Sequence, residues 1–343
     1  VPGKSDSAQQ RVQCFICCSH GFRNFHAMKV ASMTEIGAPL LSIDTIGALD
    51  VDRVYELLPL WLGGFVDAET EVVESVIDSV AAALSDFDVA EVQRTVTRIQ
   101  TTGSEYAFFE ADPVARAVMR AFVRGLLLGS KLKGAERLAA AHQSGPVLIL
   151  SNHLSYCDAQ VTDLLLADGG FSAQANRLIA VAGPKVYGTL FRRLASLGLG
   201  TIKTAQSSNL AHNDAGMTTR QVASAAMHSV GLSHQHMDAG GLVIVYGEGA
   251  RSRTARFGSF LKAVRRYARK SPLTLMPVAL SGTNQLMPLD LSKMCPASVN
   301  VEFGYPIDVA EHGALVAIQK AWHQLAEVLP QEHRPQSGCA PVG

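Results

Sequence analysis

Short apolar runs alternate with amphipathic stretches from Gly129 onward, and this alternation restricts the fold more than any other feature of the chain. The runs have the length of buried strands, and the stretches between them have helical length and spacing. Strand and helix in alternation predict an α/β domain with a mainly parallel sheet flanked by helices. We expect strands at 147–150, 178–182, 199–203, 241–246, 273–280 and 297–303. We expect helices at 156–167, 185–196, 218–232, 259–269 and 314–329.

A smaller N-terminal helical domain is expected before the sheet. Apolar residues recur at helical spacing over 51–58 and 72–84. Asp88 can cap a helix that reaches Ile99, and Pro113 suits the first turn of another that ends near 125–129. The predicted organisation is a disordered leader at 1–34, a helical domain at 35–129, the α/β domain at 130–329 and a loose tail at 330–343.

Cysteine usage indicates a reducing compartment, because the six cysteines do not form a disulfide framework. Zinc-type ligands cluster near the N-terminus: Cys14, Cys17, Cys18, His20 and His26. Their spacing matches no closed four-ligand site, so we expect no metal. A targeting peptide or a vector-derived extension explains this leader equally well, and Met28 would make a natural start.

Charge is unevenly distributed although the net charge of the chain is zero. Residues 50–112 hold 14 acidic and 3 basic side chains, whereas residues 177–270 hold 14 basic and 3 acidic ones. The basic segment should attract phosphates, an anionic membrane surface or an acidic carrier, and we expect no nucleic-acid partner. The alternative is that the acidic and basic segments dock on each other.

No apolar run reaches the roughly 18 residues that a membrane-spanning helix needs. The richest stretches, 57–66 and 121–129, are interrupted by Pro, Gly or Arg. We therefore expect a soluble or peripherally bound protein, in the cytoplasm or an organelle stroma.

The first candidate site is the segment 151–158 (SNHLSYCD), which follows a predicted strand and opens a predicted helix. Catalytic groups collect at the carboxyl ends of strands in such sheets. The imidazole of His153 can accept a proton from an alcohol, and Asp158 is placed to orient the ring and stabilise the imidazolium. The alternative is that Ser155 and Asp158 only cap the helix.

The second candidate site is the segment 245–253 (VYGEGARSR), which also follows a predicted strand. Its glycines allow a close approach of the backbone to a ligand, and Glu248 can accept hydrogen bonds from hydroxyls. Arg251 and Arg253 offer the fork geometry that binds phosphate, with Ser252 between them. The alternative is a solvated turn.

Two further segments complete the set of candidate sites. A short basic helix between strands carries Lys185, Arg192 and Arg193, for which a basic surface is the simpler explanation. A buried strand carries Pro277, and such a residue more often packs than contacts a ligand.

Taken in the order in which they occur along the chain, the four segments resemble the glycerolipid acyltransferases, the family of glycerol-3-phosphate and lysophosphatidate acyltransferases. The motifs are Asn-His-x-Ser-x-x-Asp at 152–158, a basic Gly-rich block at 183–203, Glu-Gly-x-Arg-Ser at 248–252 and Pro-Val-x-x-Ser-Gly-Thr at 277–283. The resemblance covers roughly residues 130–310 and excludes the leader and the tail.

The resemblance implies a role for each matching residue. His153 would be the general base and Asp158 its orienting partner. Glu248, Gly249 and Arg251 would hold the phosphate and glycerol parts of the acceptor, and Pro277 would shape the donor pocket. Ser252, Arg253, Lys185 and Arg193 are the remaining candidate substrate-binding residues.

The chain also departs from the family pattern. Gly247 stands where the family usually has Pro, and Ala250 where it often has Thr. The second block commonly ends in an Arg, whereas this chain offers Lys203 or Thr204. These differences bear on the identity of the acceptor.

The expected activity is transfer of a fatty acyl chain from acyl-CoA or acyl carrier protein to a hydroxyl of lysophosphatidate, a step of phospholipid biosynthesis. The thioester is a co-substrate, and no resident cofactor is expected. One alternative is glycerol-3-phosphate 1-O-acyltransferase activity, because the helical N-terminal domain resembles that of the soluble plastid-type enzymes with this activity. The other is a non-catalytic module that binds lipid or an acyl carrier.

Overall fold

A computed structural model of the chain describes residues 41–206, 213–289 and 292–343. The predicted leader, with its cluster of cysteines and histidines, lies outside the described residues. Residues from Leu41 to Gly343 form one compact unit.

The N-terminal part of this unit is helical, as its periodicity predicts. The side chain of Asp88 caps one of the helices by accepting a hydrogen bond from the backbone N–H of Glu91. Asp112 caps another in the same way through Ala115, and Pro113 occupies its first turn. The helices are α2 (Ile43–Gly47), α3 (Val51–Gly63), α4 (Thr70–Ser85), α5 (Val89–Thr101) and α6 (Pro113–Arg124).

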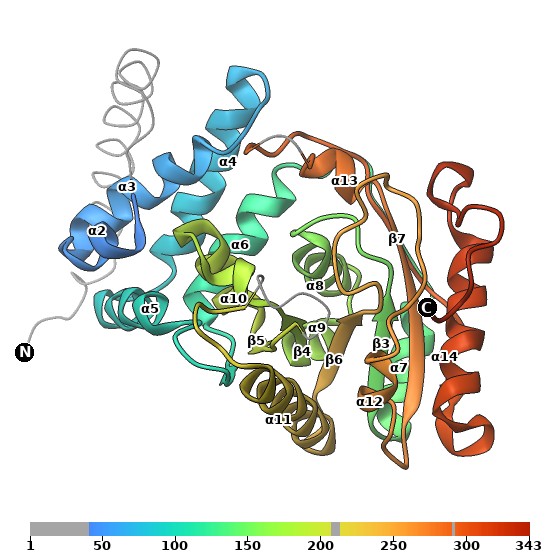
Figure 1. The fold of residues 1–343 in the computed structure, drawn as a ribbon. Helices are drawn as coiled ribbons and strands as arrows, with labels where there is room; N and C mark the ends of the chain where they lie inside the picture. The colour runs from blue at the N-terminus through green and yellow to red at the C-terminus, as the bar shows by residue number, and fades with distance from the viewer. Residues whose placement is uncertain (1–40, 207–212, 290–291) are drawn as a thin grey trace, which may run out of the picture. The chain divides into compact units, whose positions relative to one another are not determined.

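A nine-stranded sheet forms the centre of the unit, with strand order β1-β5-β4-β6-β3-β7-β8-β2 and β9 paired to β7. Figure 1 labels the neighbouring strands β5, β4, β6, β3 and β7. The pairs β5–β4, β4–β6, β6–β3, β3–β7 and β8–β2 are parallel, and the pairs at β1–β5, β7–β8 and β7–β9 are antiparallel. The predicted α/β fold with a mainly parallel sheet is therefore confirmed. The strands are β1 (Phe108–Phe109), β2 (Lys131–Lys133), β3 (Val147–Ser151), β4 (Leu178–Ala182), β5 (Thr201–Lys203), β6 (Leu242–Tyr246), β7 (Thr274–Ser281), β8 (Asn300–Phe303) and β9 (Ile307–Asp308).

Alternate residues of β3, β4, β6 and β7 enter two hydrophobic cores, one on each face of the sheet. On β3, Ile149 belongs to the core shared with α3–α6, α8 and α10, whereas Leu150 belongs to the core shared with α11, α12 and α14. The remaining helices are α7 (Ala135–Ser144), α8 (Asp158–Asp168), α9 (Ser172–Arg177), α10 (Leu190–Leu199), α11 (Thr219–Asp238), α12 (Val264–Tyr267), α13 (Thr283–Leu286) and α14 (Val309–Val328).

The prediction of a helix at 259–269 is wrong for most of that segment. Only the four residues of α12 are helical, because backbone groups before it bond to other parts of the chain. The N–H of Phe260 donates to Pro341, and the N–H of Leu261 donates to Gly247.

The tail expected to be loose after Pro330 is also different in the structure. His333 is buried and its Nδ1 lies 2.7 Å from the carbonyl oxygen of Ala255. Val342 forms a bridge with Phe260, so the last residues pack along the loop that precedes α12.

Strands β4 and β6 separate before they end, and this separation creates space at the carboxyl edge of the sheet. Their pairing stops at Ala180 and Ile244. Beyond that point β4 pairs only with β5, as far as Ala182, and β6 pairs with β3 as far as Tyr246. The gap between the two strand ends is therefore open to both faces of the sheet.

Within the described ranges, no helix is both long enough and apolar enough to cross a membrane.

Candidate active site

His153 and Asp158 meet in the loop between β3 and α8. The Nδ1 atom of His153 lies 2.8 Å from Oδ2 of Asp158, whose side chain is fully buried. A carboxylate only accepts hydrogen bonds, so Nδ1 carries the proton and Nε2 carries the lone pair. His153 lines a pocket and can present Nε2 to a ligand there.

Asp158 does more than cap a helix. It is the first residue of α8, with Cys157 as the N-cap. Its Oδ2 atom also accepts the backbone N–H groups of Leu154 and Ser155, at 2.8 and 3.0 Å. These donors belong to the loop before the helix, so the carboxylate fixes the loop that carries His153.

The imidazole of His153 is held from the side by Tyr246, the last residue of β6. The two rings stack with centroids 4.2 Å apart and an interplanar angle of 21°. Cys157 is also close, but burial and then the charge of Asp158 raise the pKa of its thiol to about 12. Because a thiol with this pKa stays protonated at neutral pH, it is a poor nucleophile.

Glu248 joins three loops instead of facing the pocket. Its Oε1 atom accepts the N–H of His153 and its Oε2 atom accepts the N–H of Gly258, both at 2.9 Å. Burial raises the pKa of this carboxyl. Glu248 therefore positions the loop that carries His153, whereas the family resemblance implies contact with the acceptor.

The glycines on either side of Glu248 are needed for packing. A Cβ on Gly247 would come within 2.1 Å of the Phe260 ring, which explains why this chain has no proline there. Gly249 has φ +73°, and a Cβ there would meet Leu261 at 2.3 Å. Both positions bring the 247–249 turn against the loop that leads to α12.

A pocket of about 280 Å³ opens where β4 and β6 separate, and it reaches both faces of the sheet. We call its two ends the α10 end and the α12 end. The α10 end is lined mainly by apolar side chains, namely Ala159, Ala180, Phe191, Ala195 and Leu199, together with Gln160 and Ser196. The α12 end is more polar and is lined by Thr204, Gln206, Ala226, Val230, Val264, Arg266 and Tyr267.

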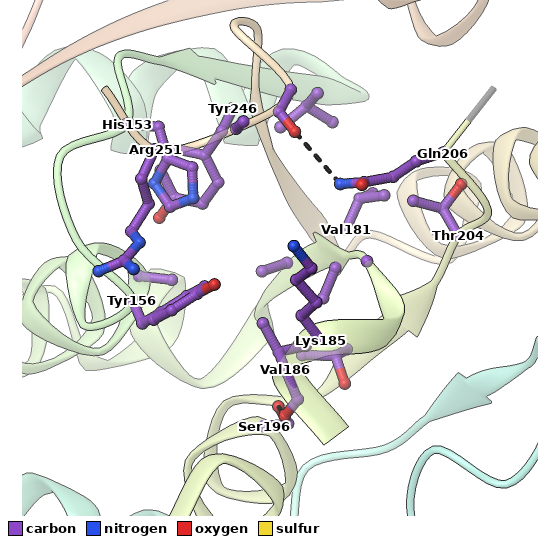
Figure 2. Close-up of a pocket in the computed structure, with 18 of the residues that line it drawn as sticks. His153, Tyr156, Val181, Lys185, Val186, Ser196, Thr204, Gln206, Tyr246 and Arg251 are labelled. Atoms are coloured by element: carbon purple, nitrogen blue, oxygen red, sulfur yellow. Dashed lines mark hydrogen bonds between the residues drawn. The ribbon is translucent and has the colours of Figure 1, made fainter. Parts of the chain in front are cut away.

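The rim of the pocket is cationic, and no Asp or Glu lines it among the described residues. The guanidinium of Arg251 lies 3.8 Å from the ring centroid of Tyr156, and that of Arg192 lies 4.4 Å from the same ring. Figure 2 shows the Lys185 amine pointing into the pocket, with Arg251 and His153 on one side. Stacking on an aromatic ring holds a guanidinium in place while leaving its N–H groups for an anion.

Some predicted substrate-binding residues lie elsewhere. Arg193 donates to the carbonyls of Tyr187 and Gln100, so it ties the start of α10 to α5. The N–H of Ser252 donates to the carbonyl of His153, and Arg253 is exposed outside the pocket lining. Pro277 is buried in β7, where it pairs with Leu150 and does not line the pocket.

Sequence reasoning missed several pocket residues. Arg192 was grouped with Arg193, although adjacent helical residues point in different directions. Arg192 shares a face of α10 with Ala195 and Leu199, and this spacing could have identified it. No sequence signal identifies Tyr246 or Arg266.

Among the residues that the structure describes, no three His, Cys, Asp or Glu side chains form a group that could hold a metal ion. Cys157, Cys295 and Cys339 are free thiols.

Part of the chain matches a known protein family. Residues 130–281 match the family model described as Acyltransferase. No curated protein sequence matches the chain significantly. Among solved structures, the chain is similar to the 1-acyl-sn-glycerophosphate (LPA) acyltransferase PlsC from Thermotoga maritima, with 19% identity and a TM-score of 0.41, over 77% of this chain and 89% of that one.

Proposed function

We propose that the protein transfers a fatty acyl chain from a thioester to a hydroxyl of a phosphate-bearing glycerolipid, because residues 130–281 match the acyltransferase family model. The proposed acceptor is lysophosphatidate, and the product would be phosphatidate, a phospholipid precursor. The observation that carries the proposal is the His153–Asp158 pair at a pocket with a cationic rim and an apolar end.

The reaction would proceed by general-base catalysis. Nε2 of His153 takes the proton of the acceptor hydroxyl as its oxygen attacks the thioester carbonyl carbon. Asp158, 2.8 Å from Nδ1, stabilises the imidazolium that forms. The C–O bond forms, the C–S bond breaks, and the imidazolium returns the proton to the departing thiolate.

The acceptor phosphate would bind at the rim. Arg251 and Arg192 share the ring of Tyr156, close to the His153 loop. A guanidinium binds phosphate through parallel hydrogen bonds, and the pocket lining supplies no carboxylate in the described residues to compete. This arrangement would hold the glycerol hydroxyl near Nε2.

The acyl chain of the donor would occupy the α10 end. Ala180, Ala195 and Leu199 are 5%, 8% and 2% exposed, so this end is buried. Phe191, Ala195 and Leu199 follow one face of α10 over about 12 Å, at 1.5 Å per residue. A buried, mainly apolar end favours an alkyl chain over water.

A thiol-release assay tests the proposal. Acyl-CoA would be supplied with lysophosphatidate, glycerol 3-phosphate or a phosphate-free monoacylglycerol. We expect the highest kcat/KM with lysophosphatidate. Preference for glycerol 3-phosphate would move the activity to the first acylation step, and absence of release with every acceptor and with acyl carrier protein donors would favour a non-catalytic binding module.

A further inference from the structure

The pocket contains a second half that the transfer chemistry at His153 does not use, namely the α12 end. We propose that the α12 end binds the phosphopantetheine arm of the thioester donor, with Arg266 at the phosphate. This inference rests on the proposed function, because it concerns the same donor.

The first argument is the path that the pocket follows. Val181 and Val245 line it from the α11–α12 core, whereas Ala180 and Phe191 line it from the core on the other face. The gap between β4 and β6 joins the two faces beside His153. An acyl thioester is a long linear molecule, so its carbonyl can lie in the gap with the acyl chain on one face and the carrier arm on the other.

The second argument is the polarity of the α12 end. Thr204 Oγ1 lies 2.7 Å from Ser229 Oγ, which lies 3.1 Å from the Tyr267 hydroxyl. Gln206 lies on the same side of the pocket as Thr204 (Figure 2). Hydroxyl and amide side chains suit the amide groups of a pantetheine arm better than they suit an alkyl chain.

The third argument is the opening of the α12 end. Arg266 both lines the pocket and is exposed, so the pocket reaches solvent there. Residues 249–270 contain eight basic side chains and no acidic one. Lys262 and Arg269 are exposed on either side of Arg266. An arm that ends in a phosphate would therefore leave the pocket through a basic opening.

Phosphopantetheine is common to coenzyme A and to acyl carrier protein, so the test begins with 4′-phosphopantetheine as the probe. Its binding would be measured by calorimetry without acceptor, for the wild type, Arg266→Gln and Ala226→Phe. Ala226 lines the α12 end on α11. The matched controls are Arg220→Gln and Ala223→Phe, because both residues are exposed on α11 and lie outside the pocket lining.

We expect Arg266→Gln to raise Kd by roughly tenfold, the size of one lost charge-assisted hydrogen bond. We expect Ala226→Phe to raise Kd as well, because the ring fills the α12 end. The controls should bind as the wild type does, and thermal melting would show that each variant is folded. Unchanged Kd in Arg266→Gln and Ala226→Phe, or an equal rise in the controls, would overturn the inference.

Steady-state kinetics separate this inference from the proposed function. With acyl-CoA and with the same acyl chain on a carrier protein, Arg266→Gln should raise the donor KM and leave the lysophosphatidate KM unchanged. A rise in KM for only one of the two donors would overturn the assignment of this site to the arm that both donors share. Transfer by a wild type that does not bind 4′-phosphopantetheine would overturn the inference alone, whereas binding without transfer to any acceptor would overturn the function alone.

Discussion

At the scale of single residues, the proposed chemistry depends on one imidazole whose orientation is fixed by its neighbours. Asp158 holds Nδ1, Tyr246 stacks on the ring, and Glu248 accepts the backbone N–H of His153. The sequence was sufficient to propose His153 and Asp158, because their spacing places both at one strand–helix junction. It could not show that Glu248 bonds backbone N–H groups, because a motif does not reveal the direction of a side chain.

His153→Ala should lower kcat by at least about 10²-fold, the contribution of a general base. No other side chain in the loop can take its place, because the Cys157 thiol stays protonated. Thiol release gives kcat, and thermal melting serves as the control for folding. A variant that keeps more than about a tenth of wild-type kcat would exclude His153 as the base.

Asp158→Asn should lower kcat by up to about 10⁴-fold, because an amide cannot stabilise an imidazolium. The amide oxygen can still accept from the backbone of Leu154 and Ser155, so the melting temperature should change little. Near-normal kcat with a large fall in melting temperature would show that Asp158 only organises the loop.

Arg251→Lys keeps the charge at the rim but loses the fork that grips a phosphate. We expect the KM for lysophosphatidate to rise roughly 10–100-fold, with the KM for acyl-CoA little changed. A phosphate-free monoacylglycerol supplies the comparison. An equal fall in kcat/KM for both acceptors would indicate that Arg251 acts through its stacking on Tyr156.

At the scale of secondary-structure elements, the strands with strong apolar runs were predictable and the short ones were not. The predicted strand at 178–182 matches β4 residue for residue. β1 and β9 have two residues each and show no alternation. The region before α12 was predicted as helix because its periodicity is helical, but tertiary hydrogen bonds to Gly247 and Pro341 determine its conformation.

Ala195→Ile should shift the donor preference toward shorter chains, because the larger side chain fills the α10 end. Each methylene that no longer fits loses about 0.8 kcal/mol, roughly a fourfold change in kcat/KM. The assay is thiol release across a series of acyl-CoA chain lengths. Ala140→Ile, at an exposed position on α7, is the control and should keep the wild-type preference. An unchanged profile in Ala195→Ile would place the acyl chain elsewhere.

Glu248→Gln tests the loop contacts through stability. Burial raises the pKa of Glu248, so the carboxyl ionises at a higher pH in the folded protein than in the unfolded chain, where it is near 4.5. The stabilising contribution is then full below that value and is lost as the pH rises through the folded pKa. The free energy of unfolding of the wild type should therefore rise relative to that of Glu248→Gln as the pH is lowered toward 4.5. Denaturant unfolding at several pH values measures this difference. A pH-independent difference would contradict the raised pKa.

At the scale of the whole molecule, the two charged segments form ion pairs within themselves. Arg98 pairs with Asp112 in the acidic segment, and Lys203 pairs with Asp214 in the basic one. The two segments also contact each other, because Arg193 and Lys203 donate to the carbonyls of Gln100 and Gly103. Arg253, Lys262 and Arg269 remain exposed. The domain boundaries near 129 and 330 stay predictions.

The protein should bind anionic vesicles peripherally through the basic segment and leave them as salt rises. Screening at about 0.15 M salt already limits such attraction to about 8 Å, so cosedimentation should fall steeply above it. Neutral vesicles supply the control. Binding that survives high salt would indicate apolar insertion instead.

One contact of α6 has a consequence for synthesis of the chain. Arg116 donates to the carbonyls of Asn176, Leu178, Gly198 and Leu199, which follow it by 60 to 83 residues. At roughly 5–20 residues per second, a ribosome needs about 4–17 s to deliver the last of them. During that interval the nascent chain exposes the apolar face of α6. This face includes Val118 and Phe122, which are fully buried in the folded protein. A chaperone that binds apolar helices would therefore meet this protein before residues 176–199 have been translated.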